Sequence, residues 1–316
     1  MSVERLQRAI NLIHANDQAG AEEVRALAFT GDPQALFVLA HLHWSETLVD
    51  QDPVRARALF EAAAARGHVQ ANLVVTNLLA SGVAGRRDWA AAIGRLRVEA
   101  GKIPARTASL QLLQAMKLDS SGEPTQMPAS RNVADRPDAR LFEKLLTPQE
   151  CQYLVAAAGQ FEPSMVYDAV GQLVQDTIRT SDGASFSWDS EDPAIHALNR
   201  RVAAASGTRY DQGEALQVLR YSPGQEYRPH FDWVDGAPNQ RIWTALIYLN
   251  DDYEGGATAF VRTGVEVRGR TGDVLLFSNV GADGNADQLA EHAGMPVTSG
   301  TKYLATRWIR ERRWIP

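Results

Sequence analysis

The sequence predicts an α+β multidomain chain with an all-helical N-terminal part and a β-rich C-terminal part. Residues 1–118 are rich in Ala, Leu and Arg and carry a repeated pattern of helix pairs. Residues 138–316 contain short apolar segments separated by turns with Gly and Asp, which is typical of a sandwich or barrel of strands. Between them, residues 119–137 are polar and interrupted by prolines, as expected for a linker.

The helical part repeats with a period of about 35 residues. Gly31–Leu36 recurs as Gly67–Asn72, and Gly101–Ala105 follows one period later. Second helices are expected at 54–66 and 89–100, and each is followed by a glycine. The pattern resembles tetratricopeptide-type repeats of the Sel-one-like subclass. That resemblance implies a short solenoid that binds a protein partner, and the alternative is a plain helical bundle that stabilises the rest of the chain.

The composition favours a cytoplasmic protein with neither nucleic acid nor membrane as a partner. The 316 residues are 45% hydrophobic and carry a formal net charge of −6, so they lack the basic surface of a nucleic-acid binder. No segment has the length of a membrane span, and Met1–Leu6 lacks the apolar core of a signal peptide. The single cysteine, Cys151, excludes an intrachain disulfide and fits a reducing compartment.

Three residues are candidate ligands of a metal ion. Alternate side chains of a strand share a face, so His230 and Asp232 are expected to project together while Phe231 points away. His292 supplies a second imidazole. Two histidines and one carboxylate leave coordination positions free, as a non-haem Fe(II) site requires. A catalytic zinc site with the same ligands is the alternative.

The surroundings of these residues strengthen the interpretation, because a His-x-Asp spacing alone is a weak signal. Leu216–Tyr221, Ile242–Leu249 and Thr301–Ile309 are predicted strands. In the last of them one face carries Lys302, Leu304, Thr306 and Trp308. We place this face inward, where a lysine needs an anionic partner such as a dicarboxylate. The alternative is a lysine on an edge strand that reaches water.

Several segments, in order from about Leu141 to Arg312, resemble the Fe(II)- and 2-oxoglutarate-dependent dioxygenases, and most closely the catalytic domain of prolyl 4-hydroxylases. Besides the metal motif these segments are Leu146–Cys151, Arg179–Ser181, Tyr221–Gln225, Gly255–Thr258, Gly272–Phe277 and His292–Trp308. The resemblance implies a double-stranded β-helix, or jelly roll, with flanking helices before Arg179.

The resemblance also implies roles for individual residues. It makes His230, Asp232 and His292 the iron ligands and Lys302 the partner of the distal carboxylate of 2-oxoglutarate. Hydroxyl groups near the cosubstrate would come from Thr258 and Tyr221. The alternative is that Thr258 is an ordinary β-branched strand residue and that Tyr221 is an aromatic residue of the core.

A peptide-substrate groove is implied beside the metal. Arg241 and Trp308 occupy family positions there, and Arg179 and Ser181 belong to a loop expected to fold over the substrate. For Arg241 and Trp308 the alternatives are an exposed charge and a core aromatic. Two departures from the family pattern are Val261, in place of a proline, and Glu291, next to the second histidine.

The activity implied is oxidation with Fe(II) as cofactor and with 2-oxoglutarate and O2 as cosubstrates, with ascorbate as a further candidate. Decarboxylation of 2-oxoglutarate to succinate and CO2 would accompany hydroxylation of a prolyl residue in a protein or peptide. The ligand set does not fix the target, so another residue, a free amino acid or a small metabolite is an alternative substrate. A repeat-based adaptor or sensor with low turnover is an alternative of another class.

Overall fold

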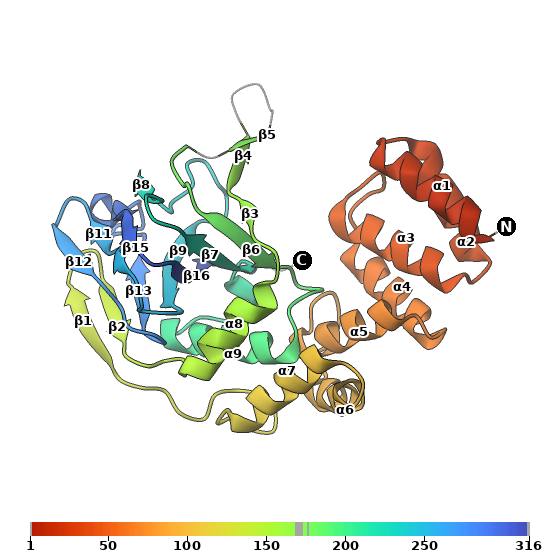
Figure 1. Cartoon of the computed structure of the whole chain (residues 1–316), viewed down its shortest axis with the longest axis horizontal. Helices are drawn as coiled ribbons and strands as arrows, with labels where there is room; N and C mark the ends of the chain where they lie inside the picture. The colour runs from red at the N-terminus through yellow and green to blue at the C-terminus, as the bar shows by residue number, and fades with distance from the viewer. Residues whose placement is uncertain (1, 168–172, 176, 315–316) are drawn as a thin grey trace. The chain divides into compact units, whose positions relative to one another are not determined.

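The computed structural model describes residues 2–167, 173–175 and 177–314. Their contacts divide them into two compact units. The first unit contains residues 2–110 and 188–193, and the second contains residues 111–187 and 194–314. The first is helical and the second is built on antiparallel sheets, so the chain has an α+β architecture (Figure 1).

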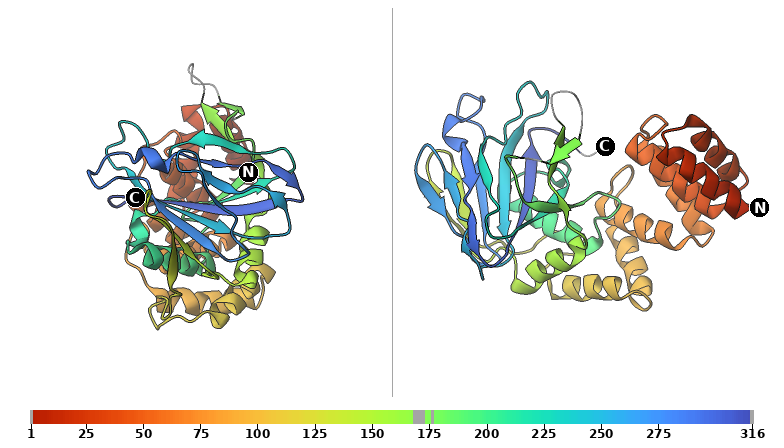
Figure 2. Two further views of the ribbon diagram at one scale, coloured as in Figure 1. Left: turned by 90° about the vertical axis from the view of Figure 1, so that its left-hand side faces the viewer. Right: turned by 45° about the horizontal axis from the view of Figure 1, so that its top comes forward.

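Consecutive helices build the first unit, and from α1 to α6 each packs against the next (Figure 2). They are α1 (Ser2–His14), α2 (Gln18–Phe29), α3 (Pro33–Ser45), α4 (Pro53–Ala65), α5 (Val69–Ser81), α6 (Trp89–Ala100) and α7 (Pro104–Ala115), which continues into the second unit. The helices predicted at 54–66 and 89–100 are confirmed as α4 and α6. None of the described helices is long and apolar enough to cross a bilayer.

Side-chain caps explain where these helices begin. Asp17, Asp32, Asp52 and Asp88 each accept a hydrogen bond from a backbone N–H in the first turn, and His68 does the same for α5. The first N–H groups of a helix have no partner within it, so such caps stabilise the start of the helix. Small and aliphatic side chains between the helices then form one buried cluster.

Two antiparallel sheets form the frame of the second unit. The large sheet contains, in spatial order, β1 (Ser130–Ala134), β2 (Ala139–Phe142), β13 (Val274–Ser278), β9 (Arg241–Tyr248), β16 (Lys302–Arg310), β7 (Leu216–Tyr221), β6 (Asp182–Phe186) and β3 (Glu162–Pro163). The small sheet contains β12 (Val265–Val267), β11 (Thr258–Phe260), β14 (His292–Gly294) and β8 (Tyr227–His230). Two further pairs are β10 (Glu254–Gly255) with β15 (Val297–Ser299), and β4 (Met165–Tyr167) with β5 (Leu173–Gln175).

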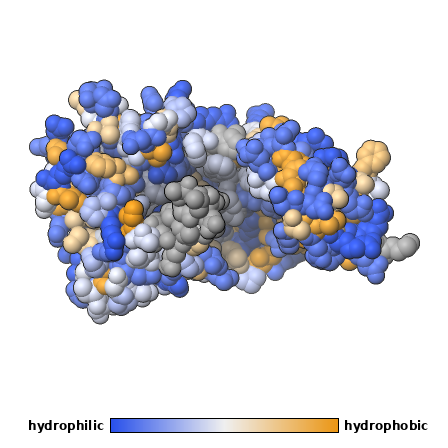
Figure 3. Space-filling model, turned by 90° about the horizontal axis from the view of Figure 1, so that it is seen from above, coloured by the Kyte–Doolittle hydropathy of each residue, from blue (hydrophilic) through white to orange (hydrophobic). Residues whose placement is uncertain are grey.

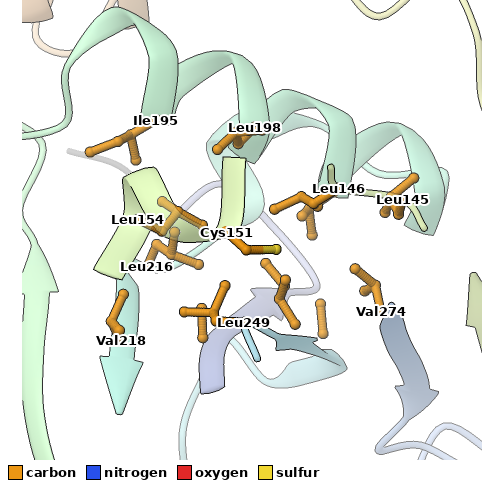
Figure 4. Close-up of a cluster of buried hydrophobic side chains, with 14 of the residues drawn as sticks. Leu145, Leu146, Cys151, Leu154, Ile195, Leu198, Leu216, Val218, Leu249 and Val274 are labelled. Atoms are coloured by element: carbon orange, nitrogen blue, oxygen red, sulfur yellow. The ribbon is translucent and has the colours of Figure 1, made fainter. Parts of the chain in front are cut away.

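Strand alternation gives the large sheet two buried faces. In β9, Ala245 and Ile247 join a cluster with α8 (Pro148–Ala158) and α9 (Pro193–Ser206), whereas Leu246 and Tyr248 join a second cluster with the small sheet. Figure 4 shows the first cluster, in which side chains of both helices point towards strand residues such as Leu216. The space between the two sheets is therefore backed by a packed layer of helices.

A buried ion pair joins α8 to α9. Arg201 donates to both carboxylate oxygens of Glu150, at 2.7 and 2.9 Å, and both residues are buried. Glu150 also accepts from the backbone N–H of Thr147, while the Thr147 hydroxyl accepts from the N–H of Glu150, which is a capping box. One carboxylate thus fixes both the start of α8 and its contact with α9.

Replacing Glu150 with alanine is expected to lower the free energy of unfolding by about 3–5 kcal/mol, because the Arg201 guanidinium would stay buried without its partner. Urea denaturation of the purified variant measures this. Glu143→Ala is the matched control, because Glu143 and its partner Arg131 are exposed and such a pair contributes about 1 kcal/mol or less. Equal losses in the two variants would contradict the expectation.

Most strand predictions are confirmed, and two features of this unit were not predicted. The segments expected at 216–221, 242–249 and 301–309 correspond to β7, β9 and β16 within about one residue. Helix α9, which follows Arg179, was not anticipated. Residues 119–137, expected to be a linker, contain β1, whose pairing with β2 makes it part of the large sheet.

Candidate active site

Two strands of the small sheet bring the candidate metal ligands together. His230 ends β8 and His292 begins β14, and the two residues are register partners in the antiparallel pair. The Nε2 atom of His230 lies 3.8 Å from Oδ1 of Asp232, and that of His292 lies 3.6 Å from its Oδ2. One ligand atom from each residue can be chosen so that all three lie within 4.8 Å of one another.

The prediction that His230 and Asp232 share a strand is wrong in one respect. β8 ends at His230, and Asp232 follows outside the sheet. The two side chains still converge, while Phe231 points to the guanidinium of Arg262, which lies 5.8 Å from its ring centre. The chain therefore leaves the sheet between the candidate ligands His230 and Asp232, and strand alternation alone does not describe how their side chains meet.

Backbone carbonyls orient both imidazole rings. Nδ1 of His230 lies 2.8 Å from the carbonyl oxygen of Arg228, and Nδ1 of His292 lies 3.0 Å from that of Ala290. A carbonyl can only accept, so each Nδ1 carries a proton and Nε2 is the ring nitrogen left to bind a metal. This is the tautomer in which both rings can bind a metal through Nε2.

The electrostatics of the site favour the protonation states that a metal requires. Burial, followed by the charge of His292, lowers the pKa of His230 to about 4. Burial raises the pKa of Asp232, but His292, His230 and the Thr244 hydroxyl outweigh it and hold that pKa below its ordinary value. A neutral imidazole of His230 and an ionised carboxylate of Asp232 are therefore present together near neutral pH, and they suit Fe(II).

A pocket between the two sheets contains most of the predicted site residues. It is lined by His230, Asp232, His292, Lys302, Thr258, Tyr221, Arg179 and Trp308, together with Leu219, Tyr227, Leu246, Gly294, Leu304 and Thr306. The inward face predicted for β16 is confirmed, because all four of its alternating residues line the pocket. Ser181 and Arg241 are not part of this lining.

Lys302 is buried in the pocket, with 2% of its surface exposed. Its Nζ donates to the carbonyl oxygen of Gly256 at 2.7 Å and lies 5.4 Å from the ring centre of Tyr221. Burial lowers the pKa of Lys302 to about 8. No carboxylate of the described residues forms an ion pair with it, so the site has unused capacity for an anion.

Hydroxyl groups lie close to this lysine. The Tyr248 hydroxyl donates to Oγ1 of Thr258 at 3.0 Å, and both residues are buried. Burial raises the pKa of Tyr221 to about 12, so it stays a neutral phenol. Thr258 and Tyr221 therefore place uncharged hydroxyl groups in the same pocket as the buried ammonium of Lys302. This combination suits a carboxylate, whose oxygens accept hydrogen bonds.

Arg241 and Ser181 lie behind the pocket wall. Arg241 donates to both oxygens of Glu214, at 2.7 and 2.9 Å, and its guanidinium stacks 3.9 Å from the ring centre of Trp308. Ser181 is fully buried, and its hydroxyl lies 3.2 Å from that of Ser164. Arg241 thus supports the indole that lines the pocket, and its charge helps to lower the pKa of Asp232.

Sequence reasoning missed Tyr227 and Glu214. The Tyr227 ring stacks on His230 with centres 3.5 Å apart and lines the pocket. Glu214 accepts hydrogen bonds from both Arg241 and Arg310. It therefore holds the guanidinium of Arg241 in place against the ring of Trp308. The only available signal was for Tyr227, an aromatic residue three positions before a candidate ligand.

The two departures from the family pattern lie beside the ligands. Glu291 forms an ion pair with Arg262 at 2.6 Å, and its carbonyl accepts from the N–H of Val261. Val261 is partly exposed on the surface. The charge of Glu291 is therefore paired outside the pocket, and the adjacent His292 remains free to face inward.

The fold and the donor set define a mononuclear metal enzyme of the two-histidine, one-carboxylate class. The model of the 2OG-Fe(II) oxygenase superfamily matches residues 216–310, which include all three candidate ligands and Lys302. The chain belongs to this superfamily and, within it, to the prolyl 4-hydroxylase family. It is a 2-oxoglutarate-dependent dioxygenase with Fe(II) as cofactor and with 2-oxoglutarate and O2 as cosubstrates.

Two plant relatives support this assignment, and one solved structure is also similar to the chain. Prolyl 4-hydroxylase 1 of Arabidopsis thaliana is 36% identical over 201 residues, which are 57% of this chain and 71% of the relative. Prolyl 4-hydroxylase 2 of the same plant is 31% identical over 207 residues, covering 57% and 69%. The viral collagen prolyl hydroxylase of Paramecium Bursaria Chlorella virus-1, solved as a 2OG complex, is 26% identical with a TM-score of 0.46, covering 57% of this chain and 99% of that chain.

Proposed function

We propose that this dioxygenase hydroxylates prolyl residues of a protein or peptide. Its relatives are prolyl 4-hydroxylases. The observation that carries the proposal is the pair of aromatic side chains, Tyr227 and Trp308, in the wall of the pocket that contains the metal ligands. An apolar ring such as pyrrolidine packs well against aromatic faces, and a pocket of this kind selects by shape.

The proposed metal ligands are Nε2 of His230, Nε2 of His292 and one carboxylate oxygen of Asp232. Fe(II) held by these residues would supply, with 2-oxoglutarate and O2, the oxidation of a C–H bond, and the cosubstrate would leave as succinate and CO2. The carbonyls of Arg228 and Ala290 hold the imidazoles in the required tautomer. The apolar wall, including Leu219 and Leu246, excludes water from the reacting atoms.

Lys302 is the proposed partner of the distal carboxylate of 2-oxoglutarate. Its ammonium group already donates to one carbonyl, which leaves two further N–H groups for an anion. Thr258 and Tyr221 provide hydroxyls in the same pocket. A buried ammonium and a carboxylate form a charge-assisted hydrogen bond, which is stronger than one between neutral groups.

The affinity for 2-oxoglutarate is expected to fall as pH rises above about 8. Lys302 has a lowered pKa of about 8 in the free protein, and a bound carboxylate raises that pKa because it stabilises the charged form. Binding therefore requires proton uptake above pH 8, and the dissociation constant rises about tenfold per pH unit there, with little change below pH 8.

Calorimetry of the Mn(II)-loaded protein between pH 7 and 9.5, in buffers of different ionisation enthalpy, measures both the affinity and the proton uptake. Lys302→Met should bind weakly at every pH and take up no proton. An affinity of the unaltered protein that does not change between pH 7 and 9.5 would contradict the role given to the lysine.

The finer architecture of the two units is also part of the proposal. We assign the second unit to the double-stranded β-helix, or jelly-roll, class, because a large and a small antiparallel sheet enclose the metal ligands between them. We assign the first unit to the helical-repeat solenoids, because consecutive helices pack pairwise and the helix-start pattern of α3 recurs at α5.

The helical unit is proposed to recruit a protein partner or the substrate. In the face shown in Figure 3, hydrophobic side chains lie in separate patches among hydrophilic ones. Among the exposed apolar residues of the helical unit are Phe29, Val54 and Val69, with Phe29 93% exposed. Phe29→Glu with Val69→Glu should weaken capture of a protein substrate but leave turnover of a short peptide unchanged. Unchanged kinetics on both substrates would favour a purely stabilising helical bundle.

Succinate release by the purified protein tests the main proposal. The protein is incubated with Fe(II) and 2-oxoglutarate, with and without proline-containing peptides, and with matched peptides in which alanine replaces each proline. We expect stimulation only by peptides with proline, and a mass increase of one oxygen atom on that residue. Stimulation by both peptide sets would point to another target residue, and binding of 2-oxoglutarate without turnover would support a sensor.

A further inference from the structure

A chain of two buried hydrogen bonds ends on the carboxylate of Asp232. The Thr244 hydroxyl donates to Oδ2 of Asp232 at 2.6 Å, and Nδ2 of Asn279 donates to the Thr244 hydroxyl at 2.9 Å. Thr244 is fully buried and Asn279 is 2% exposed. Neither residue lines the pocket, so these two hydrogen bonds reach the proposed metal site from the large sheet and not from the pocket.

The short contact at Asp232 fixes the direction of both bonds. An ionised carboxylate can only accept, so the Thr244 hydroxyl must direct its proton to Oδ2. That hydroxyl then offers only lone pairs to Asn279, which must present its amide NH2 group. The opposite amide orientation would place an oxygen against a hydroxyl oxygen whose proton is already committed.

This orientation leaves one polar atom of Asn279 without compensation. Its Oδ1 is buried and has no hydrogen-bond partner among the described residues. The backbone of the same residue is held on both sides, because its N–H donates to Ile242 and its carbonyl accepts from Asp287. A buried acceptor without a partner is unfavourable. The amide of Asn279 therefore keeps its hydrogen bond to the Thr244 hydroxyl although its own Oδ1 stays without a donor.

The two oxygens of Asp232 consequently differ. Oδ2 accepts the Thr244 hydroxyl, whereas Oδ1 receives no hydrogen bond from the residues that the structure describes. We propose that Asn279 and Thr244 are positioning residues that hold Asp232 so that Oδ1 binds the metal and Oδ2 does not. This inference rests on the proposed role of Asp232 as a ligand.

One-oxygen binding has a consequence for the cosubstrate. A carboxylate that binds through both oxygens occupies two coordination positions, and a facial ligand set must keep its remaining positions for other groups. By keeping Oδ2 on the Thr244 hydroxyl, the chain of hydrogen bonds both preorganises the ligand and preserves room for 2-oxoglutarate.

The test is the affinity of the metal-free full-length protein for Mn(II), measured by calorimetry without turnover. Thr244→Val keeps the side-chain shape and removes the hydroxyl, and we expect its dissociation constant for Mn(II) to rise about tenfold or more. Thr244→Ser restores the donor and should return the affinity to within about twofold of the unaltered protein. With saturating metal, Thr244→Val should also raise KM for 2-oxoglutarate more than it lowers kcat.

Asn279 provides a second arm that a general loss of stability would not reproduce. In this proposal Asn279 acts on Asp232 only through the Thr244 hydroxyl. Asn279→Ala should therefore weaken Mn(II) binding when Thr244 is unaltered, but it should have no further effect when it is combined with Thr244→Val. Thr208→Val is the matched control, because it removes a hydrogen bond to Ser206 outside the pocket and should leave the metal affinity unchanged.

The outcomes separate this inference from the proposed function. If the unaltered protein binds Mn(II) and Thr244→Val binds it equally well, the positioning role is wrong and the metal site stands. Additive losses from the two variants would also overturn the inference. If Asp232→Ala binds Mn(II) as the unaltered protein does, the metal site itself is wrong.

Discussion

Replacing Asp232 with alanine is expected to abolish 2-oxoglutarate turnover. The variant loses the only anionic member of the proposed ligand set, and two neutral imidazoles hold a divalent cation much less firmly. The dissociation constant for Mn(II) should rise more than about 100-fold, beyond the loss that follows when only a supporting group is removed. Succinate release and calorimetry measure the two effects independently.

Folding of the Asp232→Ala variant must be checked, because Asp232 is 4% exposed. Removal of a buried carboxylate also leaves the Thr244 hydroxyl without its acceptor. Asp235→Ala is the matched control, because Asp235 lies in the same segment but is exposed. Circular dichroism should show the same fold for both variants. Full activity of Asp232→Ala in a folded protein would remove this residue from the site.

Replacing Lys302 with alanine is expected to weaken 2-oxoglutarate binding about 30-fold or more, because truncation of one partner of a buried charge pair costs about 2–5 kcal/mol. Metal affinity should stay within about twofold, since the ligands are unchanged. Equilibrium binding of 2-oxoglutarate to the Mn(II) protein measures the loss. Lys102→Ala, at an exposed position, is the control and should change neither affinity.

The same lysine is expected to lower the stability of the free protein. Its pKa is below the ordinary value of 10.5, so the charged form is less favourable in the folded chain than in the unfolded chain. The contribution of Lys302 to the free energy of unfolding is therefore least favourable below pH 8 and improves between pH 8 and 10.5. Lys302→Met should melt no lower than the unaltered protein at pH 7. A large loss of stability would mean that the lysine serves packing instead.

Local sequence signals located the strands that carry the site. Apolar, β-branched runs predicted β7, β9 and β16, and alternation along β16 placed Lys302 and Trp308 on one face before any partner strand was known. Alternation is informative because successive side chains of a strand point to opposite faces. Where the two faces have different surroundings, the sequence shows a period of two.

Long-range contacts could not be predicted in the same way. Thr244 lies between apolar residues of a predicted strand. The sequence does not show that β9 brings its hydroxyl within hydrogen-bond distance of Asp232. Glu214 and Arg241 are 27 positions apart and meet through the pairing of β7, β9 and β16. Such pairs depend on sheet order, and hydrophobic periodicity carries no information about which strands become neighbours.

Helix α9 and strand β1 show a second limit. The segment 193–206 contains four arginine, asparagine or histidine side chains among its apolar residues, and His196 and Asn199 are nevertheless buried. Tertiary packing against α8 and the large sheet therefore overrides the polar appearance of this sequence. β1 is exposed along much of its length, so its alternation was too weak to detect.

The central claim is that one metal ion joins His230, Asp232 and His292, and that 2-oxoglutarate connects this ion to Lys302. Anomalous diffraction from crystals with Mn(II) and 2-oxoglutarate tests it most directly. We predict a single peak bound by Nε2 of both histidines and one oxygen of Asp232, with the distal carboxylate of 2-oxoglutarate against Nζ of Lys302. A metal peak away from these three residues, or a distal carboxylate bound elsewhere than Lys302, would contradict the account.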